Sequence, residues 1–297
     1  MKKYYNFKEV KEFVSKPLFN EKVILHKDPK YPKISIVTPS YNQAQFLERT
    51  ILSVLNQNYP NLEYIIIDGG STDGSVEIIK KYENYLAYWI CEKDKGQADA
   101  INKGFKKSTG EILAWLNSDD TYLPDALQSV ADFFKQHPNT DMLYGRCYMM
   151  DQDDEIFQEA KAMPFNLLDY IYGLFTIPQQ TTFWRKDIFF KAGMLNTENH
   201  TCMDGELWIN FAKNKANITF VNRFLANFRL HYESISGSGR YNNQYQQDKM
   251  RIQYDVLGYL PNPVGKILRR VWFITKYPIA HIRYYLSVLC KGRVPVK

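Results

Sequence analysis

Apolar positions along residues 33–125 switch repeatedly between two spacings. Short continuous apolar runs, typical of strands buried on both faces, alternate with segments whose apolar residues recur three and four positions apart, as in amphipathic helices. The pattern predicts strands at residues 33–38, 62–67, 86–91 and from 111 onward, and helices at 45–58, 76–82 and 97–107. This alternation predicts an α/β fold in which helices flank a mostly parallel sheet.

Polar and acidic residues follow each of the four expected strands. Because right-handed crossovers bring the carboxyl ends of parallel strands to one edge, these residues should converge where open α/β sheets bind ligands. The fourth run closes with two adjacent carboxylates, Asp119 and Asp120, whose repulsion a divalent cation would relieve. An exposed turn rich in Ser and Asp is the structural alternative. The residues expected at this edge are Thr38, Asp68, Glu92, Asp94, Asp119 and Asp120.

Four segments in order resemble the motifs of family 2 glycosyltransferases, which are inverting enzymes with the Rossmann-like GT-A fold. They are TPSYN at residues 38–42, DGGSTDGS at 68–75, KGQADAINKG at 95–104 and NSDD at 117–120. The match covers about residues 33–125 and continues more loosely to about 236. It implies a nucleotide-sugar donor, with a UDP-sugar expected, and Mn²⁺ or Mg²⁺ as cofactor.

The resemblance also implies a role for each matched position. Tyr41 should lie beside the base, and Asp68 should accept a hydrogen bond from the uracil ring nitrogen. Asn117 stands where many members have Asp, and Ile101 where many have Arg, so the diphosphate needs another cation. The implied donor-binding residues are Thr38, Pro39, Ser40, Tyr41, Asp68, Lys95, Asp99, Asn117, Asp119 and Arg229, with Lys103 as a further candidate cation; the implied metal ligands are Asp119, Asp120 and His231.

Asp204 precedes a segment with helical spacing at residues 207–212. An acid at a helix start is a common cap, but the resemblance implies that Asp204 is the catalytic base, with Glu206 as the next candidate. His231 is either a structural histidine or, by the resemblance, a group that reaches the metal or the diphosphate. Trp184 and Trp208 are expected in the core rather than stacked on an acceptor sugar.

The basic residues of this chain are concentrated at its C-terminal end. The formal net charge is +6, and no acidic residue follows Asp255. Charged residues interrupt the apolar stretch there, so the segment should not span a bilayer. A membrane-surface element is one interpretation of this basic amphipathic tail; a helical hairpin packed on the domain or on a dimer partner is the other. Nucleic acid is not expected, because no binding motif accompanies the charge.

These features divide the chain into three expected parts. Residues 1–32 form an N-terminal extension, 33–236 the GT-A domain and 237–297 the basic helical tail. Within the domain, 33–125 form the nucleotide-sugar half and 126–236 the acceptor half. Four scattered cysteines imply no disulfide framework, and no secretory signal opens the chain. A cytoplasmic protein, peripheral on the cytoplasmic face of the membrane, is therefore expected.

The sequence predicts an inverting, metal-dependent glycosyltransferase. It would move a sugar from a UDP donor to a glycan or lipid-linked acceptor, as in surface polysaccharide synthesis. One alternative is a non-catalytic nucleotide- or carbohydrate-binding protein on a degenerate transferase fold, which Asn117 and Ile101 keep open. The other is a sugar nucleotidyltransferase, although residues 39–43 lack the Gly-rich, basic loop expected after its first strand.

Overall fold

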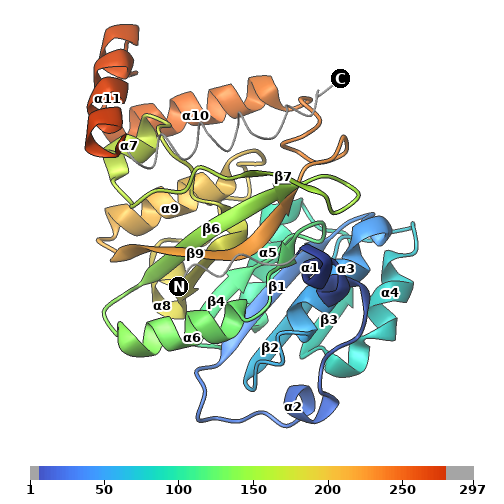
Figure 1. Ribbon diagram of the computed structural model, residues 1–297. Helices are drawn as coiled ribbons and strands as arrows, with labels where there is room; N and C mark the ends of the chain where they lie inside the picture. Colours follow the sequence, from blue (N-terminus) through green and yellow to red (C-terminus); the bar gives the residue numbers. More distant parts are fainter. Residues whose placement is uncertain (1–6, 279–297) are drawn as a thin grey trace.

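The computed structural model describes residues 7–278 and has a mixed α/β architecture (Figure 1). In this part of the chain, one sheet has the strand order β3-β2-β1-β4-β8-β6-β9-β5, and β7 pairs with β6. The strands are β1 (Ile34–Ser40), β2 (Leu62–Asp68), β3 (Tyr88–Cys91), β4 (Ile112–Trp115), β5 (Thr121–Tyr122), β6 (Met142–Met150), β7 (Ile156–Glu159), β8 (Thr182–Arg185) and β9 (Ile218–Arg229). The helices are α1 (Phe7–Ser15), α2 (Glu21–Leu25), α3 (Ala44–Leu55), α4 (Ser75–Lys81), α5 (Gln97–Lys107), α6 (Ala126–Gln136), α7 (Leu167–Ile171), α8 (Lys186–Lys191), α9 (Met203–Lys213), α10 (Asn242–Leu257) and α11 (Pro263–Lys276), with 3₁₀ turns η1 (Glu83–Tyr85) and η2 (Gln179–Thr181).

The strands β3, β2, β1 and β4 are all parallel to one another, as predicted. Ser40 pairs with Asp68, and Asp68 pairs with Cys91, so the carboxyl ends of β1, β2 and β3 are level. The acidic segments that follow these strands therefore meet at one edge of the sheet, which confirms their expected convergence.

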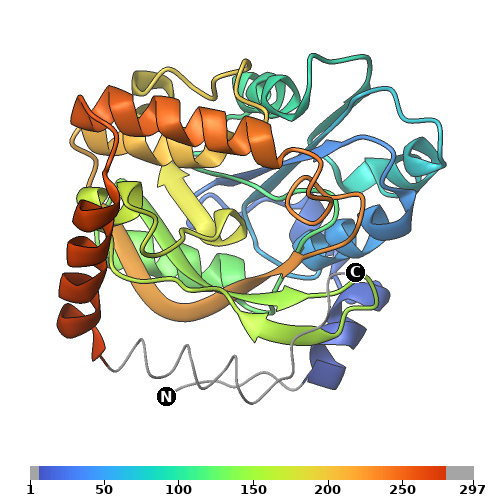
Figure 2. The same ribbon diagram turned by 90° about the horizontal axis from the view of Figure 1, so that it is seen from above.

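The second half of the sheet mixes strand directions. β8 runs antiparallel to both β4 and β6, whereas the long strand β9 is parallel to β6 and antiparallel to β5. The pairing of β6 with β9 shifts register at Arg146, and irregularities of this kind bend a strand. Figure 2 shows β9 curving across the molecule, and its end at Arg229 lies beside the segment that follows β4.

Two apolar cores cover the two faces of the sheet. Ile34 and Ile36 of β1 face the core formed with α3, α4 and α6, whereas Val37 faces the core formed with α5, α8 and α9. Trp184 and Trp208 are fully buried in the second core, with ring centroids 5.4 Å apart. Their expected place in the core is confirmed.

Both ends of the described chain pack against the sheet's covering helices. Near the N-terminus, Val10 and Ile24 are buried, and the Asn56 side chain after α3 bonds the backbone of residues 16 and 18. At the other end, α10 lies over α9, and α11 extends from it (Figures 1 and 2). Between residues 7 and 278, no helix combines the length and apolarity needed to cross a membrane. Residues 279–297 of the predicted tail lie outside the described residues.

Candidate active site

A cleft of about 1510 Å³ opens at the carboxyl edge of the parallel strands. Its walls come from both halves of the fold, which is the usual place for a ligand in an open α/β sheet. Pro39, Ser40, Tyr41, Asp94, Gln97, Asn117 and Asp119 line it from the first half of the chain, and Tyr170, His200, Asp204, Glu233, Tyr245 and Lys249 are among the lining residues from later in the chain.

Tyr41 and Asp94 face each other across Gly69. The Tyr41 ring is largely exposed, and a Cβ atom at Gly69 would lie 2.7 Å from Asp94 Oδ2 and 3.3 Å from Tyr41 Cδ2. The absence of a side chain at Gly69 therefore lets both Asp94 and Tyr41 approach the backbone here. The sequence predicted that Asp94 lies at this edge but did not predict a function for it. Its position just after a strand is the same feature that pointed to Asp119.

Asp68 has a different environment from the one predicted. Its side chain is fully buried and caps the turn after β2. Oδ1 accepts hydrogen bonds from the Gly70 and Ser71 amides at 3.0 and 2.8 Å, and Oδ2 accepts one from the Ser71 hydroxyl at 2.7 Å. The carboxylate of Asp68 therefore stabilises the turn and does not line the cleft, and its contact with a uracil ring stays a prediction. Thr38 is also buried and bonds Tyr64 at 3.1 Å.

The two adjacent carboxylates separate into different environments. Asp119 lines the cleft, and its Oδ2 lies 3.1 Å from His231 Nε2. Asp120 is fully buried: its Oδ1 accepts the Arg229 amide at 2.9 Å, and its Oδ2 accepts the Gln180 amide group at 2.9 Å. Burial, reinforced by the charge of Asp119, raises the pKa of Asp120 well above its ordinary value. The prediction of Asp120 as a metal ligand is thus corrected, since its oxygens point into the protein.

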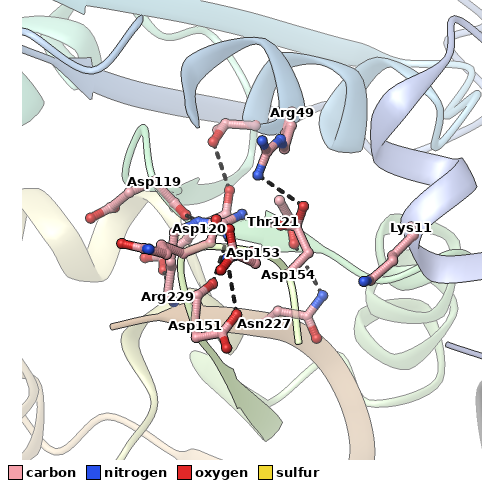
Figure 3. Close-up of polar contacts among 12 residues, drawn as sticks. Lys11, Arg49, Asp119, Asp120, Thr121, Asp151, Asp153, Asp154, Asn227 and Arg229 are labelled. Atoms are coloured by element: carbon pink, nitrogen blue, oxygen red, sulfur yellow. Dashed lines mark hydrogen bonds and ion pairs between the residues drawn. The ribbon is translucent and has the colours of Figure 1, made fainter. Parts of the chain in front are cut away.

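Arg229 is the centre of a buried polar network around the end of β4 (Figure 3). Its Nε donates to the Asp119 carbonyl at 2.8 Å, and Nη1 donates to the Asp151 carbonyl at 2.9 Å. Nη2 lies 2.6 Å from Asp154 Oδ1, and Arg49 of α3 bonds the other Asp154 oxygen at 2.8 Å. The predicted role of Arg229 as a diphosphate cation is wrong, because its fully buried guanidinium faces Asp154 rather than the cleft.

Asp204 lies in the first turn of α9, and it lines the cleft as predicted. Burial raises the pKa of its carboxyl group, although backbone hydrogen bonds at Asp204 and Gly205 oppose this effect. Tyr170 and Tyr245 lie close enough for the charge of Asp204 to contribute to the raised pKa of their hydroxyls. A carboxylate with a raised pKa binds a proton more strongly than an ordinary aspartate, which suits a general base.

A family model described as glycosyl transferase family 2 matches residues 35–215, which is more than half of the chain. The chain belongs to this family. It is therefore a glycosyltransferase, and the resemblance noted in its motifs is confirmed.

Curated relatives and solved structures agree with this assignment. A teichuronic acid biosynthesis glycosyltransferase of Bacillus subtilis, TuaG, is 29% identical over 70% of this chain and 82% of its own length. An uncharacterized glycosyltransferase of Mycobacterium tuberculosis is 30% identical over 61% of this chain and 69% of its own.

The fold resembles that of two glycosyltransferases of known structure. The S. aureus TarS structure with UDP-GlcNAc has a TM-score of 0.63 at 19% identity, covering 85% of this chain and 73% of its own. The Pyrobaculum calidifontis mannosyltransferase PcManGT, solved with GDP-Man and Mn²⁺, has a TM-score of 0.59 at 16% identity, covering 98% and 83%. These likenesses confirm the GT-A fold.

Two side chains, Asp119 at the cleft and His231 behind it, fit a cation that is bound together with the substrate. Among residues 7–278, no group of three or more His, Cys, Asp or Glu side chains is arranged to hold a metal ion. Asp119 and His231 nevertheless offer one carboxylate oxygen and one imidazole nitrogen 3.1 Å apart, a pair that suits Mn²⁺. The remaining ligands would be diphosphate oxygens and water, which is the common arrangement for such cations.

Glu206, the second candidate base, is part of a structural ion pair. Arg251 of α10 donates two hydrogen bonds of 3.0 Å to its two carboxylate oxygens, and Asn199 donates another at 2.7 Å. Burial works to raise the pKa of Glu206, but these hydrogen bonds outweigh it and leave that pKa below its ordinary value. A carboxylate held in this way is a poor base, so the catalytic prediction for Glu206 is corrected.

The cations predicted from the 95–104 motif do not line the cleft. Asp99 pairs with Lys103 at 3.3 Å and accepts the Lys95 amide at 3.1 Å, so this group stabilises the start of α5. The lysines that line the cleft are instead Lys161 and Lys249. No local motif in the sequence surrounds either lysine, so sequence reasoning had no signal with which to find them.

The burial of Arg229 predicts a large effect on stability. Replacing Arg229 with Met should lower the free energy of unfolding by about 3–5 kcal/mol, because Asp154 and the carbonyls of residues 119 and 151 would lose a buried charged partner. Guanidinium chloride unfolding measures the change. The control is Lys81→Met, which breaks the exposed pair with Glu48 and should cost less than about 1 kcal/mol. Equal stability of both variants would contradict the role given to Arg229.

Proposed function

We propose that this glycosyltransferase moves a sugar from a UDP-sugar to a hydroxyl of a glycan or lipid-linked acceptor, with inversion at the anomeric carbon and with the help of a divalent cation. The observation that carries the proposal is that Asp204, Asp119 and the exposed Tyr41 ring line a single cleft. The proposal is supported by TarS, which was solved with UDP-GlcNAc, by PcManGT, which was solved with GDP-Man and Mn²⁺, and by the name of TuaG, which points to a surface polymer.

Each wall of the cleft has its own part in this reaction. Tyr41 would stack on the base, and Asp94 would accept a hydrogen bond from a ring N–H group. Asp119 and His231 would hold the cation, which supplies Lewis-acid stabilisation of the departing diphosphate. Asn117 lines the same wall and has an amide group that can bond a ribose hydroxyl.

The transfer needs a single displacement. Asp204 would take the proton from the acceptor hydroxyl while the oxygen attacks the anomeric carbon. The new C–O bond forms as the bond to the diphosphate breaks, and the bonding electron pair leaves with the diphosphate oxygen. One base suffices, so no covalent sugar–enzyme intermediate is expected.

A nucleotide thermal-shift screen tests the donor site. With UDP at about a hundredfold excess over its Kd, the melting temperature should rise by about 5 °C or more in the presence of Mn²⁺. The Mn²⁺-dependent part should vanish in Asp119→Asn, which removes a carboxylate from the cleft. The control is Asp132→Asn on the outer side of α6, which should respond like the wild type. If only a nucleotide with another base raises the melting temperature, the assignment of UDP is overturned. If none of UDP, GDP, CDP and dTDP raises it, the donor site itself is overturned.

Asp204→Asn tests the base. UDP release in the presence of glycan acceptors should fall by about 10²–10⁴-fold, because a positioned general base contributes about that much. Donor binding should persist in the same variant, since Asp204 takes part only in the chemical step. Glu206→Gln should instead keep its turnover and lose thermal stability. Near-normal turnover in Asp204→Asn would eliminate it as the base.

The raised pKa of Asp204 also predicts a pH dependence. The base acts as a carboxylate, so kcat/KM should be constant at pH values well above the pKa of Asp204 and fall as the pH drops through that pKa. Burial places that pKa above the ordinary value of 3.8, so the fall should begin at a higher pH than an ordinary aspartate would give. A pH–rate profile that stays flat down to an ordinary aspartate pKa would contradict this environment.

A further inference from the structure

Helix α11 packs on the protein through a side that carries Arg269 and Phe273. Arg269 donates to the buried Asp169 of α7 at 2.7 Å and also bonds Asn166 at 3.2 Å. Phe273, one turn later, is 1% exposed and lies against Phe175 with ring centroids 6.3 Å apart. Because residues four apart share one face of a helix, Arg269 and Phe273 define the side that contacts the protein.

The opposite side of α11 is apolar and lies in solvent. Residues three and four apart along the helix form one continuous stripe there. Its large apolar side chains are between 38% and 65% exposed, whereas an apolar stripe normally faces a core. The residues of this outer face are Val264, Ile267, Leu268, Val271, Trp272 and Ile274.

Positive charge borders the outer face. Lys266, Arg270 and Lys276 are exposed, and the helix carries no acidic residue. The Trp272 ring lies between Arg269 and Lys276, with cation-to-centroid distances of 4.5 and 4.7 Å. An apolar stripe with a tryptophan at its margin and basic side chains beside it is the composition of helices that lie in the interface of an anionic bilayer.

We propose that the outer face of α11 binds the surface of an anionic lipid bilayer. The apolar side chains would enter the boundary between head groups and acyl chains, and the basic residues would contact lipid phosphates. Asp169 contacts α11 but is already paired with Arg269. The positive charges of Lys266, Arg270 and Lys276 are therefore not neutralised by it.

The position of α11 links this surface to the cleft. In both views α11 stands at the margin of the molecule, with its lower end beside α7 in Figure 1 (Figures 1 and 2). Tyr170 and Gly173 line the cleft, and Asp169 next to Tyr170 bonds Arg269. A bilayer on the outer face would therefore hold the acceptor side of the cleft near the membrane. This last step rests on the proposed function, whereas the binding of lipid does not.

Vesicle flotation of the full-length protein tests the proposal. Vesicles of phosphatidylcholine with about 30 mol% phosphatidylglycerol should carry the protein upward, and vesicles of phosphatidylcholine alone should carry much less. The double variant Leu268→Glu/Val271→Glu should reduce the partition coefficient by about tenfold or more, because two apolar side chains leave the interface. Its matched control is Leu18→Glu/Leu25→Glu, which changes two other exposed leucines and the net charge by the same amount.

The outcomes separate the possible occupants of the outer face. Selective loss of flotation in the α11 variant, with unchanged melting temperature and unchanged UDP release in solution, supports the membrane surface. Equal flotation of both double variants overturns it. Absence of wild-type flotation also overturns it: a dimer in light scattering that dissociates in the α11 variant would assign the face to a second copy. A lowered melting temperature of that variant would assign it to another segment of this chain.

Discussion

The burial of one guanidinium group organises the site of this transferase. Arg229 connects the end of β4, the turn between β6 and β7, and helix α3, which are distant in sequence. A buried charge without partners is very costly, so these segments must all supply acceptors in the right geometry at once. The segment that carries Asp119 is therefore held by buried contacts to its backbone, such as the one from Arg229 to the Asp119 carbonyl. The side chain of Asp119 can then face the cleft.

This constraint explains how two like charges can be neighbours at the end of a strand. Asp120 points toward the interior, where amide donors from Arg229 and Gln180 meet its oxygens. Asp119 points the other way, toward water and His231. The pair resembles other acidic pairs in active sites, in which different surroundings give identical groups different properties. Asp204 shows a third environment, since it is partly buried in the first turn of α9 and still lines the cleft.

The parts of the fold that the sequence predicted are those with local causes. Strand and helix periods are visible within a dozen residues, and the crossover rule then brings the ends of β1, β2 and β4 to one edge. The corrections at Asp120, Glu206 and Arg229 share another cause. Each of these side chains was assigned a role from its place at the sheet edge or in a motif. The direction of the side chain depends instead on distant partners that the local sequence does not reveal. Arg251, for example, lies 45 positions from Glu206, and Asp120 and Arg229 are 109 apart.

A second Arg–Asp pair, in which the aspartate is buried and the arginine partly exposed, also fixes the position of an element. Arg269 and Asp169 contribute little net stability if desolvation offsets their attraction, but they fix which side of α11 contacts the body. The periodicity of residues 264–274 was visible in the sequence, whereas the direction of the apolar stripe was not. Without these contacts, a helix of this composition would turn its apolar face toward the protein to lower its free energy. Because the Arg269–Asp169 pair and Phe273 occupy the inner side, the apolar residues face outward, and this exposed apolar surface is the one proposed to contact a bilayer.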